Sequence, residues 1–105
     1  MHLFFKTDAN EQIGSGHLQR CLNLAEFLKN KHKVTFIFCD TPKLILKEIK
    51  KNFKIIVFKD NKNILNNAKK FFKKKDHNYL ILDDYSVNYH WEKSISYYFS
   101  KVLVI

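Results

Sequence analysis

Five short runs rich in β-branched and aromatic residues alternate along this chain with four segments whose apolar residues recur at helical spacing. The five runs are residues 2–6, 33–39, 53–58, the first part of 78–85, and 101–105. This alternation is typical of βαβ units, which build a parallel sheet with helices on both faces. With right-handed crossovers, we expect an α/β, Rossmann-like, doubly wound sheet of five strands in the order 3-2-1-4-5.

The four helical segments lie between these runs, and the sequence also indicates where several of them begin and end. From Leu18 onward, apolar residues fall on one helical face: Leu18, Cys21, Leu22, Ala25 and Leu28. Asp40 or Thr41 is expected to cap the second helix, with Pro42 in its first turn. The third helix is expected over residues 61–75 and the fourth over about 88–99. No repeat or linker divides the chain, so residues 1–105 are predicted to form a single domain.

The composition excludes several classes of protein. Hydrophobic residues make up 46% of the 105 residues and aromatic residues 15%, which is too apolar for a disordered chain. No run of 18 apolar residues predicts a membrane span, and the N-terminus lacks a signal-peptide hydrophobic region. Cys21 and Cys39 lie in different elements and outside any CxxC motif, which is typical of reduced thiols. We therefore expect a cytoplasmic protein without a membrane partner.

The net charge of +9 raises the possibility of nucleic-acid binding. However, Arg20 is the only arginine among the 19 basic residues, and the lysines are spread over helix faces and helix ends. Recognition of bases and phosphates favours the planar fork of arginine. The sequence therefore predicts no nucleic-acid partner.

The turn between the first strand and the first helix is the strongest candidate site. It carries the sequence Gly14-Ser15-Gly16-His17 at the carboxyl edge of the expected sheet, where ligands bind in open α/β folds. Glycines let the backbone approach a ligand, and a helix start offers unpaired N–H groups. Neither a third glycine nor a Gly-Lys-Ser/Thr follows, so the turn is not a dinucleotide fingerprint or a P-loop. A solvated glycine turn remains the alternative.

Polar residues border this turn on both sides. Asp8 precedes it, and Arg20 follows His17 in the first helical turn. Arg20 could bind phosphate or hold the turn through its five donors.

A second polar turn follows the fourth strand and contains Asp83, Asp84 and Tyr85. In the expected strand order the first and fourth strands are neighbours, so His17 and Tyr85 should face one crevice. The alternative is a capped, solvated strand end. Two adjacent aspartates point in opposite directions and offer too few oxygen ligands for Mg²⁺, so no metal and no cofactor is expected.

These two segments resemble a known family. The stretch KTDANEQIGSGHLQRCLNLA is similar to the opening of the UDP-sugar hydrolase of pseudaminic acid biosynthesis, which carries Arg-x-Asp, then Ile-Gly-x-Gly-His and an Arg three residues on. LDDY is similar to a family segment in which a strand ends in Asp, a variable polar residue and Tyr. Lys6 departs from the family, which usually has Arg there, so the charge is kept and the bidentate geometry is not.

The resemblance implies the N-terminal half of a glycosyltransferase-B-type fold. The family removes UDP from a diacetamido-trideoxyhexose by attack of water at the anomeric carbon, with inversion and without a metal. His17 would then be the catalytic base. Substrate-binding roles would fall to seven other residues: Asp8, Gly14, Ser15, Gly16, Arg20, Asp83 and Tyr85. The C-terminal UDP-binding domain is absent from these 105 residues, so a separate domain or chain is expected to complete the site.

Two other functions stay open from the residues alone. MurG-like glycosyltransferases also use a glycine-rich first turn with a nearby histidine, and a glycosyl acceptor would then replace water. A non-enzymatic α/β binding module is the other alternative. In every case we expect the 105-residue chain alone to show little UDP-sugar hydrolysis.

Overall fold

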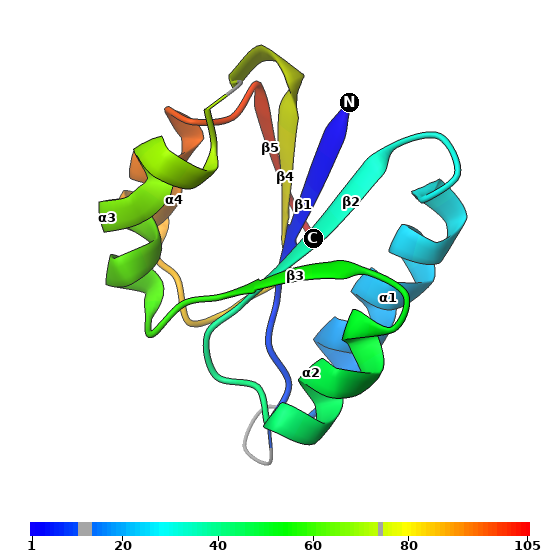
Figure 1. Cartoon of the computed structure of the whole chain (residues 1–105). Helices are drawn as coiled ribbons and strands as arrows, with labels where there is room; N and C mark the ends of the chain where they lie inside the picture. The colour runs from blue at the N-terminus through cyan, green and yellow to red at the C-terminus, as the bar shows by residue number, and fades with distance from the viewer. Residues whose placement is uncertain (11–13, 74) are drawn as a thin grey trace.

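The computed structural model describes residues 1–10, 14–73 and 75–105 and contains one parallel sheet. Its strands are β1 (His2–Lys6), β2 (Lys33–Phe38), β3 (Lys54–Val57), β4 (Asn78–Leu82) and β5 (Lys101–Val104). They pair in parallel in the order β3-β2-β1-β4-β5 (Figure 1). The predicted fold class and strand order are therefore confirmed.

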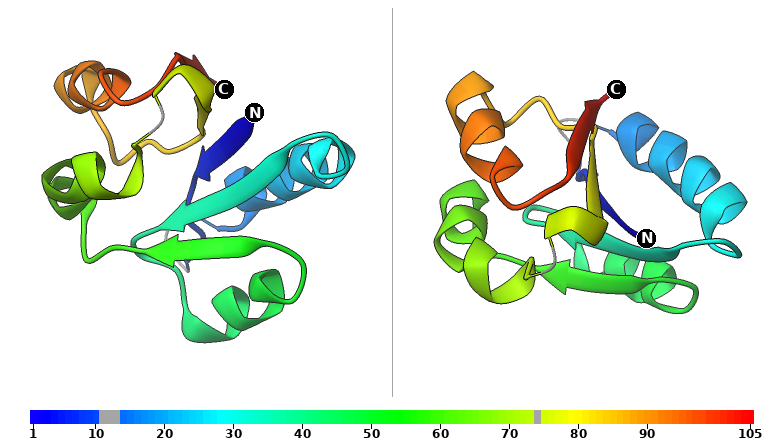
Figure 2. Two further views of the ribbon diagram at one scale, coloured as in Figure 1. Left: turned by 45° about the horizontal axis from the view of Figure 1, so that its top comes forward. Right: turned by 90° about the horizontal axis from the view of Figure 1, so that it is seen from above.

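Two helices cover each face of the sheet (Figure 2). The helices α1 (Gly16–Leu28) and α2 (Lys43–Lys50) lie on one face, and α3 (Asn61–Phe71) and α4 (Tyr89–Ser96) lie on the other. A short 3₁₀ turn, η1 (Lys75–His77), leads into β4. Among the described residues, no helix has the length and apolarity needed to cross a membrane.

Alternating side chains of the strands supply two separate cores. In β1, Leu3 and Phe5 pack toward α1 and α2, whereas Phe4 packs toward α3 and α4. In β4, Ile81 faces the first core and Leu82 the second. Because neighbouring residues of an extended strand point to opposite faces, polar residues just beyond a strand end are also sorted between the two helix layers.

The first turn of α2 differs from the prediction. Pro42, rather than Asp40 or Thr41, is the N-cap, and no side chain caps this helix. The hydroxyl of Thr41 is engaged elsewhere, because it donates to Asp8 Oδ1 (2.7 Å) and accepts from the backbone N–H of Ala9 (3.0 Å). Thr41 thus joins two loops at the carboxyl edge of the sheet.

The third helix is shorter than predicted, ending at Phe71 rather than at residue 75. Phe72 leaves the helical conformation (φ −119°) and is buried against Phe4, with ring centroids 5.0 Å apart. The lysines that follow offer no apolar side chain to continue the buried stripe, so packing of Phe72 ends the helix.

Both cysteines are free thiols, as predicted. Cys21 is fully buried in α1, and Cys39 is half-buried just after β2. Burial raises the pKa of Cys21 to about 12 and that of Cys39 to about 11. Both therefore remain protonated at neutral pH, which makes them poor nucleophiles.

Candidate functional site

His17 is held at the start of α1 by a buried carboxylate. Its Nδ1 lies 2.5 Å from Asp83 Oδ1, and Asp83 is only 1% exposed. Arg20 donates to the same carboxylate with two nitrogens, Nε to Oδ2 at 2.8 Å and Nη2 to Oδ1 at 2.9 Å. Arg20 thus fixes Asp83 with a bidentate fork, and Asp83 fixes the imidazole ring of His17.

This contact selects one tautomer of His17. A carboxylate can only accept, so Nδ1 carries the proton that it donates to Asp83. The lone pair of a neutral His17 then lies on Nε2, the nitrogen that is free to receive a proton. Arg20 Nη2 also lies 3.1 Å from Nδ1, but a protonated Nδ1 cannot accept from it. The arrangement has the logic of a carboxylate that orients a histidine base.

Asp84 holds the loop that carries Tyr85, on the opposite face of the sheet. It forms an ion pair with Lys6, which is fully buried, and its Oδ1 accepts from the backbone N–H (2.8 Å) and hydroxyl (2.6 Å) of Ser86. Asn61 at the start of α3 donates to the Ser86 hydroxyl (3.0 Å). These contacts set the position of Tyr85 between Asp84 and Ser86.

The two rings held in this way meet edge to face. The centroids of His17 and Tyr85 are 4.7 Å apart, with an interplanar angle of 87°. Tyr85 is 86% exposed, so its ring stands in solvent beside the imidazole. As the strand order predicts, the turns after β1 and β4 lie together at the carboxyl edge of the sheet.

A pocket of about 330 Å³ opens beside these rings. It is lined by Asp8, Asn10, His17, Cys39, Asp40, Lys59, Asp60, Asn61, Asp83, Asp84, Tyr85 and Ser86. These residues come from the loops and helix starts that follow each of the first four strands. Among the described residues of this lining, five carboxylates accompany one lysine, so this lining is acidic although the chain as a whole is basic.

Asp8 lies in the wall of the pocket but contacts the loop after β2. Its Oδ1 accepts hydrogen bonds from the backbone N–H groups of Cys39 (3.0 Å) and Asp40 (2.9 Å) and from the hydroxyl of Thr41. Burial raises the pKa of Asp8 in spite of these bonds. The carboxylate that orients His17 is therefore Asp83, and Asp8 could still offer its second oxygen to a ligand in the pocket.

The residues of the glycine turn differ in backbone conformation and in their contacts. Gly14 has a φ of +72° and donates to the carbonyl oxygen of Asn10 (2.8 Å), a conformation that requires glycine. Gly16 opens α1, and a Cβ there would meet open space. Ser15 is the N-cap and makes no side-chain capping hydrogen bond. Ile13 begins the Ile-Gly-x-Gly-His segment and, with residues 11 and 12, lies outside the described residues.

Electrostatics keep the paired aspartates ionised. Burial alone would raise both pKa values, but the hydrogen bonds from Arg20 and His17 hold the pKa of Asp83 below its usual range. The charge of Lys6 does the same for Asp84. Both carboxylates therefore act as fixed negative charges at neutral pH.

Sequence reasoning missed one wall of the pocket, formed by Asp40, Lys59, Asp60, Asn61 and Ser86. A signal for most of them was present, because Asp40 and Lys59-Asp60-Asn61 closely follow the second and third strands. All parallel strands end at the same edge, so their following turns belong to one site. Within the described residues, no group of three or more His, Cys, Asp or Glu side chains could hold a metal ion.

Comparison with known proteins finds a similar protein in an archaeon. Over 98 residues the chain is 34% identical to uncharacterized protein MJ1062 from Methanocaldococcus jannaschii. The match covers 90% of this chain but only 19% of the archaeal protein, so the chain spans about a fifth of that relative's length. No family model and no solved structure matches the chain.

Proposed function

We propose that this domain is the catalytic N-terminal half of a UDP-sugar hydrolase that acts on a UDP-diacetamido-trideoxyhexose in nonulosonate biosynthesis. The observation that carries the proposal is the His17–Asp83–Arg20 arrangement at the mouth of the pocket. The resemblance of the glycine turn and of LDDY to the pseudaminic acid hydrolases supplies the substrate class.

In the proposed reaction, His17 Nε2 accepts a proton from a water molecule as the water oxygen attacks the anomeric carbon. The bond between that carbon and the UDP oxygen breaks, and UDP leaves with the electron pair. UDP is a good leaving group, so a single base suffices and the two carboxyl groups of ordinary glycosidases are not required. Asp83 stabilises the imidazolium that forms, because it lies against Nδ1.

The remaining pocket suits the sugar better than the diphosphate. Tyr85 offers an exposed ring for the apolar face of a deoxysugar, and Asp8 and Asp60 offer acceptors for hydroxyl or amide N–H groups. Within the described lining, a diphosphate would meet mostly carboxylates, with Lys59 as the one lysine. We infer that the uracil, ribose and diphosphate are bound by a further domain or chain.

The test is product analysis with a UDP-diacetamido-trideoxyhexose and a protein that joins this domain to a UDP-binding domain. We expect UDP and free sugar with inverted anomeric configuration, and His17→Asn should lower turnover by about a hundredfold or more. His90→Asn, at an exposed position of α4, is the matched control and should retain its rate.

Three outcomes would contradict this proposal. A near-normal rate in His17→Asn would show that His17 is not the base. Formation of a new glycoside only when an acceptor is supplied would identify a transferase of the MurG-like kind. Micromolar UDP binding by the 105-residue chain as a clean monomer, with NMR chemical-shift changes at the pocket beside His17, would place the nucleotide site in this half, against the two-domain interpretation.

A further inference from the structure

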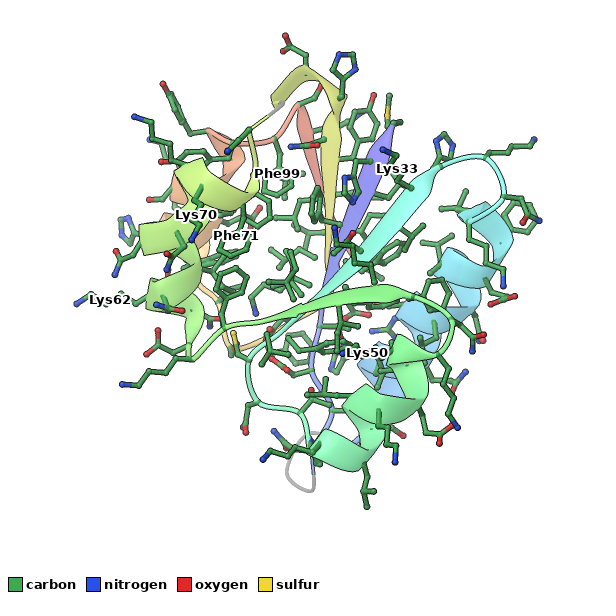
Figure 3. The ribbon with its side chains drawn as sticks, in the orientation of Figure 1. Lys33, Lys50, Lys62, Lys70, Phe71 and Phe99 are labelled. Atoms are coloured by element: carbon green, nitrogen blue, oxygen red, sulfur yellow. The ribbon has the colours of Figure 1, made fainter. Side chains whose placement is uncertain are left out.

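The amino edge of the sheet, opposite the candidate active site, carries a second and larger pocket. Its volume is about 590 Å³, and it lies between the start of the strands and the turn that joins α1 to β2. The residues of its lining that matter here are His2, Lys29, Lys31, Lys33, His77 and Asn78. An adjoining pocket shares His2, Lys29 and Lys33 and adds Lys54. Figure 3 shows Lys33 at this edge, near the start of β2.

Positive charge gathers here with little compensation. The lining of both pockets, as far as the structure describes it, contains no Asp or Glu. Lys29 is paired with Glu26 on α1 (2.5 Å), whereas Lys31 and Lys33 form no ion pair with any described residue. Burial lowers the pKa of His2, and the charges of Lys54, Lys33 and the N-terminus lower it further, to about 4.

Asn78 distinguishes this pocket from a surface that is merely basic. This first residue of β4 lines the pocket although it is only 4% exposed. Its side-chain amide has no hydrogen-bond partner among the described residues. The side-chain nitrogen and oxygen of Asn78 reach solvent, because neither is among the described buried side-chain atoms that lack a partner. An amide held in the wall of the pocket without a protein partner is available to a group that enters the pocket.

We propose that the amino-edge pocket binds the phosphate group of a small phosphorylated ligand, with Asn78 as the buried donor and Lys31 and Lys33 as the cations. A tetrahedral phosphate can accept from ammonium groups and an amide that approach from different directions. A planar carboxylate gains most from the fork of arginine, and the described lining of this pocket contains none.

The lining also argues against a nucleic acid as the ligand. Single-stranded nucleic acids gain much of their binding energy by stacking bases on aromatic rings. The described lining of the 590 Å³ pocket contains no Phe, Tyr or Trp. Its volume lies in the range of pockets for small molecules.

The experiment is an NMR titration of the 105-residue chain with inorganic phosphate and with pyrophosphate at about 0.15 M ionic strength, where distant surface charges are largely screened. We expect saturable shifts centred on the Asn78 side-chain amide, and a His2 pKa that rises when the anion is bound. Asn78→Asp keeps the shape but replaces the donor with a negative charge, and should weaken pyrophosphate binding at least about tenfold.

Lysine variants distinguish pyrophosphate binding at a specific site from general electrostatic attraction to a basic protein. Lys33→Gln should weaken pyrophosphate binding several-fold. Lys62→Gln makes the same charge change on α3, where Figure 3 shows the side chain pointing away from the sheet, and should leave binding unchanged. Should Asn78→Asp fail to fold, Asn78→Ala together with the Lys31→Gln and Lys33→Gln variants provides the same test.

Three results would overturn the proposal. One is unchanged affinity when Asn78 loses its donor, and another is equal weakening by Lys33→Gln and Lys62→Gln. The third is an oligonucleotide of about 20 nucleotides that binds more tightly than pyrophosphate, with a steep salt dependence and no sensitivity to Asn78→Asp. That result would identify a polyanion surface instead.

Discussion

The two edges of the sheet differ in how their charged side chains are paired. At the carboxyl edge, Asp83 and Asp84 are buried and each has named partners, Arg20 and His17 for the first and Lys6 for the second. At the amino edge, lysines gather around a pocket whose described lining holds no carboxylate. One edge therefore fixes side-chain geometry, and the other produces a positive field with few fixed contacts.

The difference follows from how each edge is built. Asp83 and Asp84 are neighbours in an extended segment, so one reaches α1 and the other reaches the layer of α3 and α4. Each aspartate positions one ring, His17 through a direct bond and Tyr85 through the turn at Ser86. At the amino edge the lysines lie on a turn and at strand starts, where long side chains keep their charges in water.

The largest expected effect comes from breaking the pair between Lys6 and Asp84. Asp84→Asn removes the ion-pair partner of the fully buried Lys6, which should lower the free energy of unfolding by about 3–5 kcal/mol. Chemical denaturation measures the loss, and Asp76→Asn at an exposed site is the control. A loss as small as that of the control would show that Lys6 is compensated by other groups, such as the Trp91 ring 5.5 Å away.

Lowering the pH should reduce the contribution of each edge to stability in a different pH range. The pKa of folded His2 is lowered to about 4 from 6.5, so the unfolded chain binds its proton first and stability falls between these values. Asp83 and Asp84 have lowered pKa values, so their contribution is present above their unfolded value of 3.8 and is lost below it as pH falls through their folded values. The pKa of Asp8 is raised, so the folded chain binds this proton first. Asp8 therefore opposes part of the loss that occurs above pH 3.8 and not the loss below it.

The matched variant for this pH profile is His2→Gln, which can keep a hydrogen bond to the Thr35 hydroxyl, 2.7 Å from His2 Nε2. Thermal unfolding should be measured from pH 7 to pH 2. In this variant, the loss of stability between pH 6.5 and pH 4 should disappear, and the loss below pH 3.8 should remain. A profile identical to that of the unaltered chain would contradict the assignment of the loss between pH 6.5 and pH 4 to His2.

Much of the fold could be predicted from the sequence because each strand and helix carries its own periodic pattern. The strand order and the meeting of His17 with Tyr85 both follow from right-handed crossovers. Helix ends were less predictable, since Phe72 ends α3 through a tertiary contact with Phe4 that no local pattern reports.

The partners of the site aspartates could not be predicted in the same way. Asp8 lies nearest to the glycine turn in sequence, yet its Oδ1 accepts from Cys39, Asp40 and Thr41, which requires the placement of the loop after β2. The choice of Asp83 rather than Asp84 as the partner of His17 depends on which face each side chain takes. That choice is fixed by the exact residue at which β4 ends.

A smaller effect tests the rigidity of the turn at the carboxyl edge. Gly14→Ala forces a Cβ into a φ of +72° and should cost about 1–2 kcal/mol of stability. Gly16→Ala has open space for its Cβ and should leave stability nearly unchanged. If Gly16→Ala nevertheless lowers turnover in a two-domain protein, the lost activity reports close approach of the substrate to the backbone. Equal costs for the two substitutions in denaturation would contradict the assigned conformation of Gly14.

The smallest expected effect is at the amino edge, where a substitution should stabilise the protein rather than destabilise it. Lys33→Gln removes one of the charges that repel each other around the pocket, so without a ligand it should raise the free energy of unfolding by a few tenths of a kcal/mol. Lys62→Gln, outside this cluster, should change it less. Added salt should reduce the gain, because screening weakens repulsion between exposed charges. A clear loss of stability in Lys33→Gln would mean that Lys33 has a favourable partner, and the two edges of the sheet would then be alike in pairing their charges.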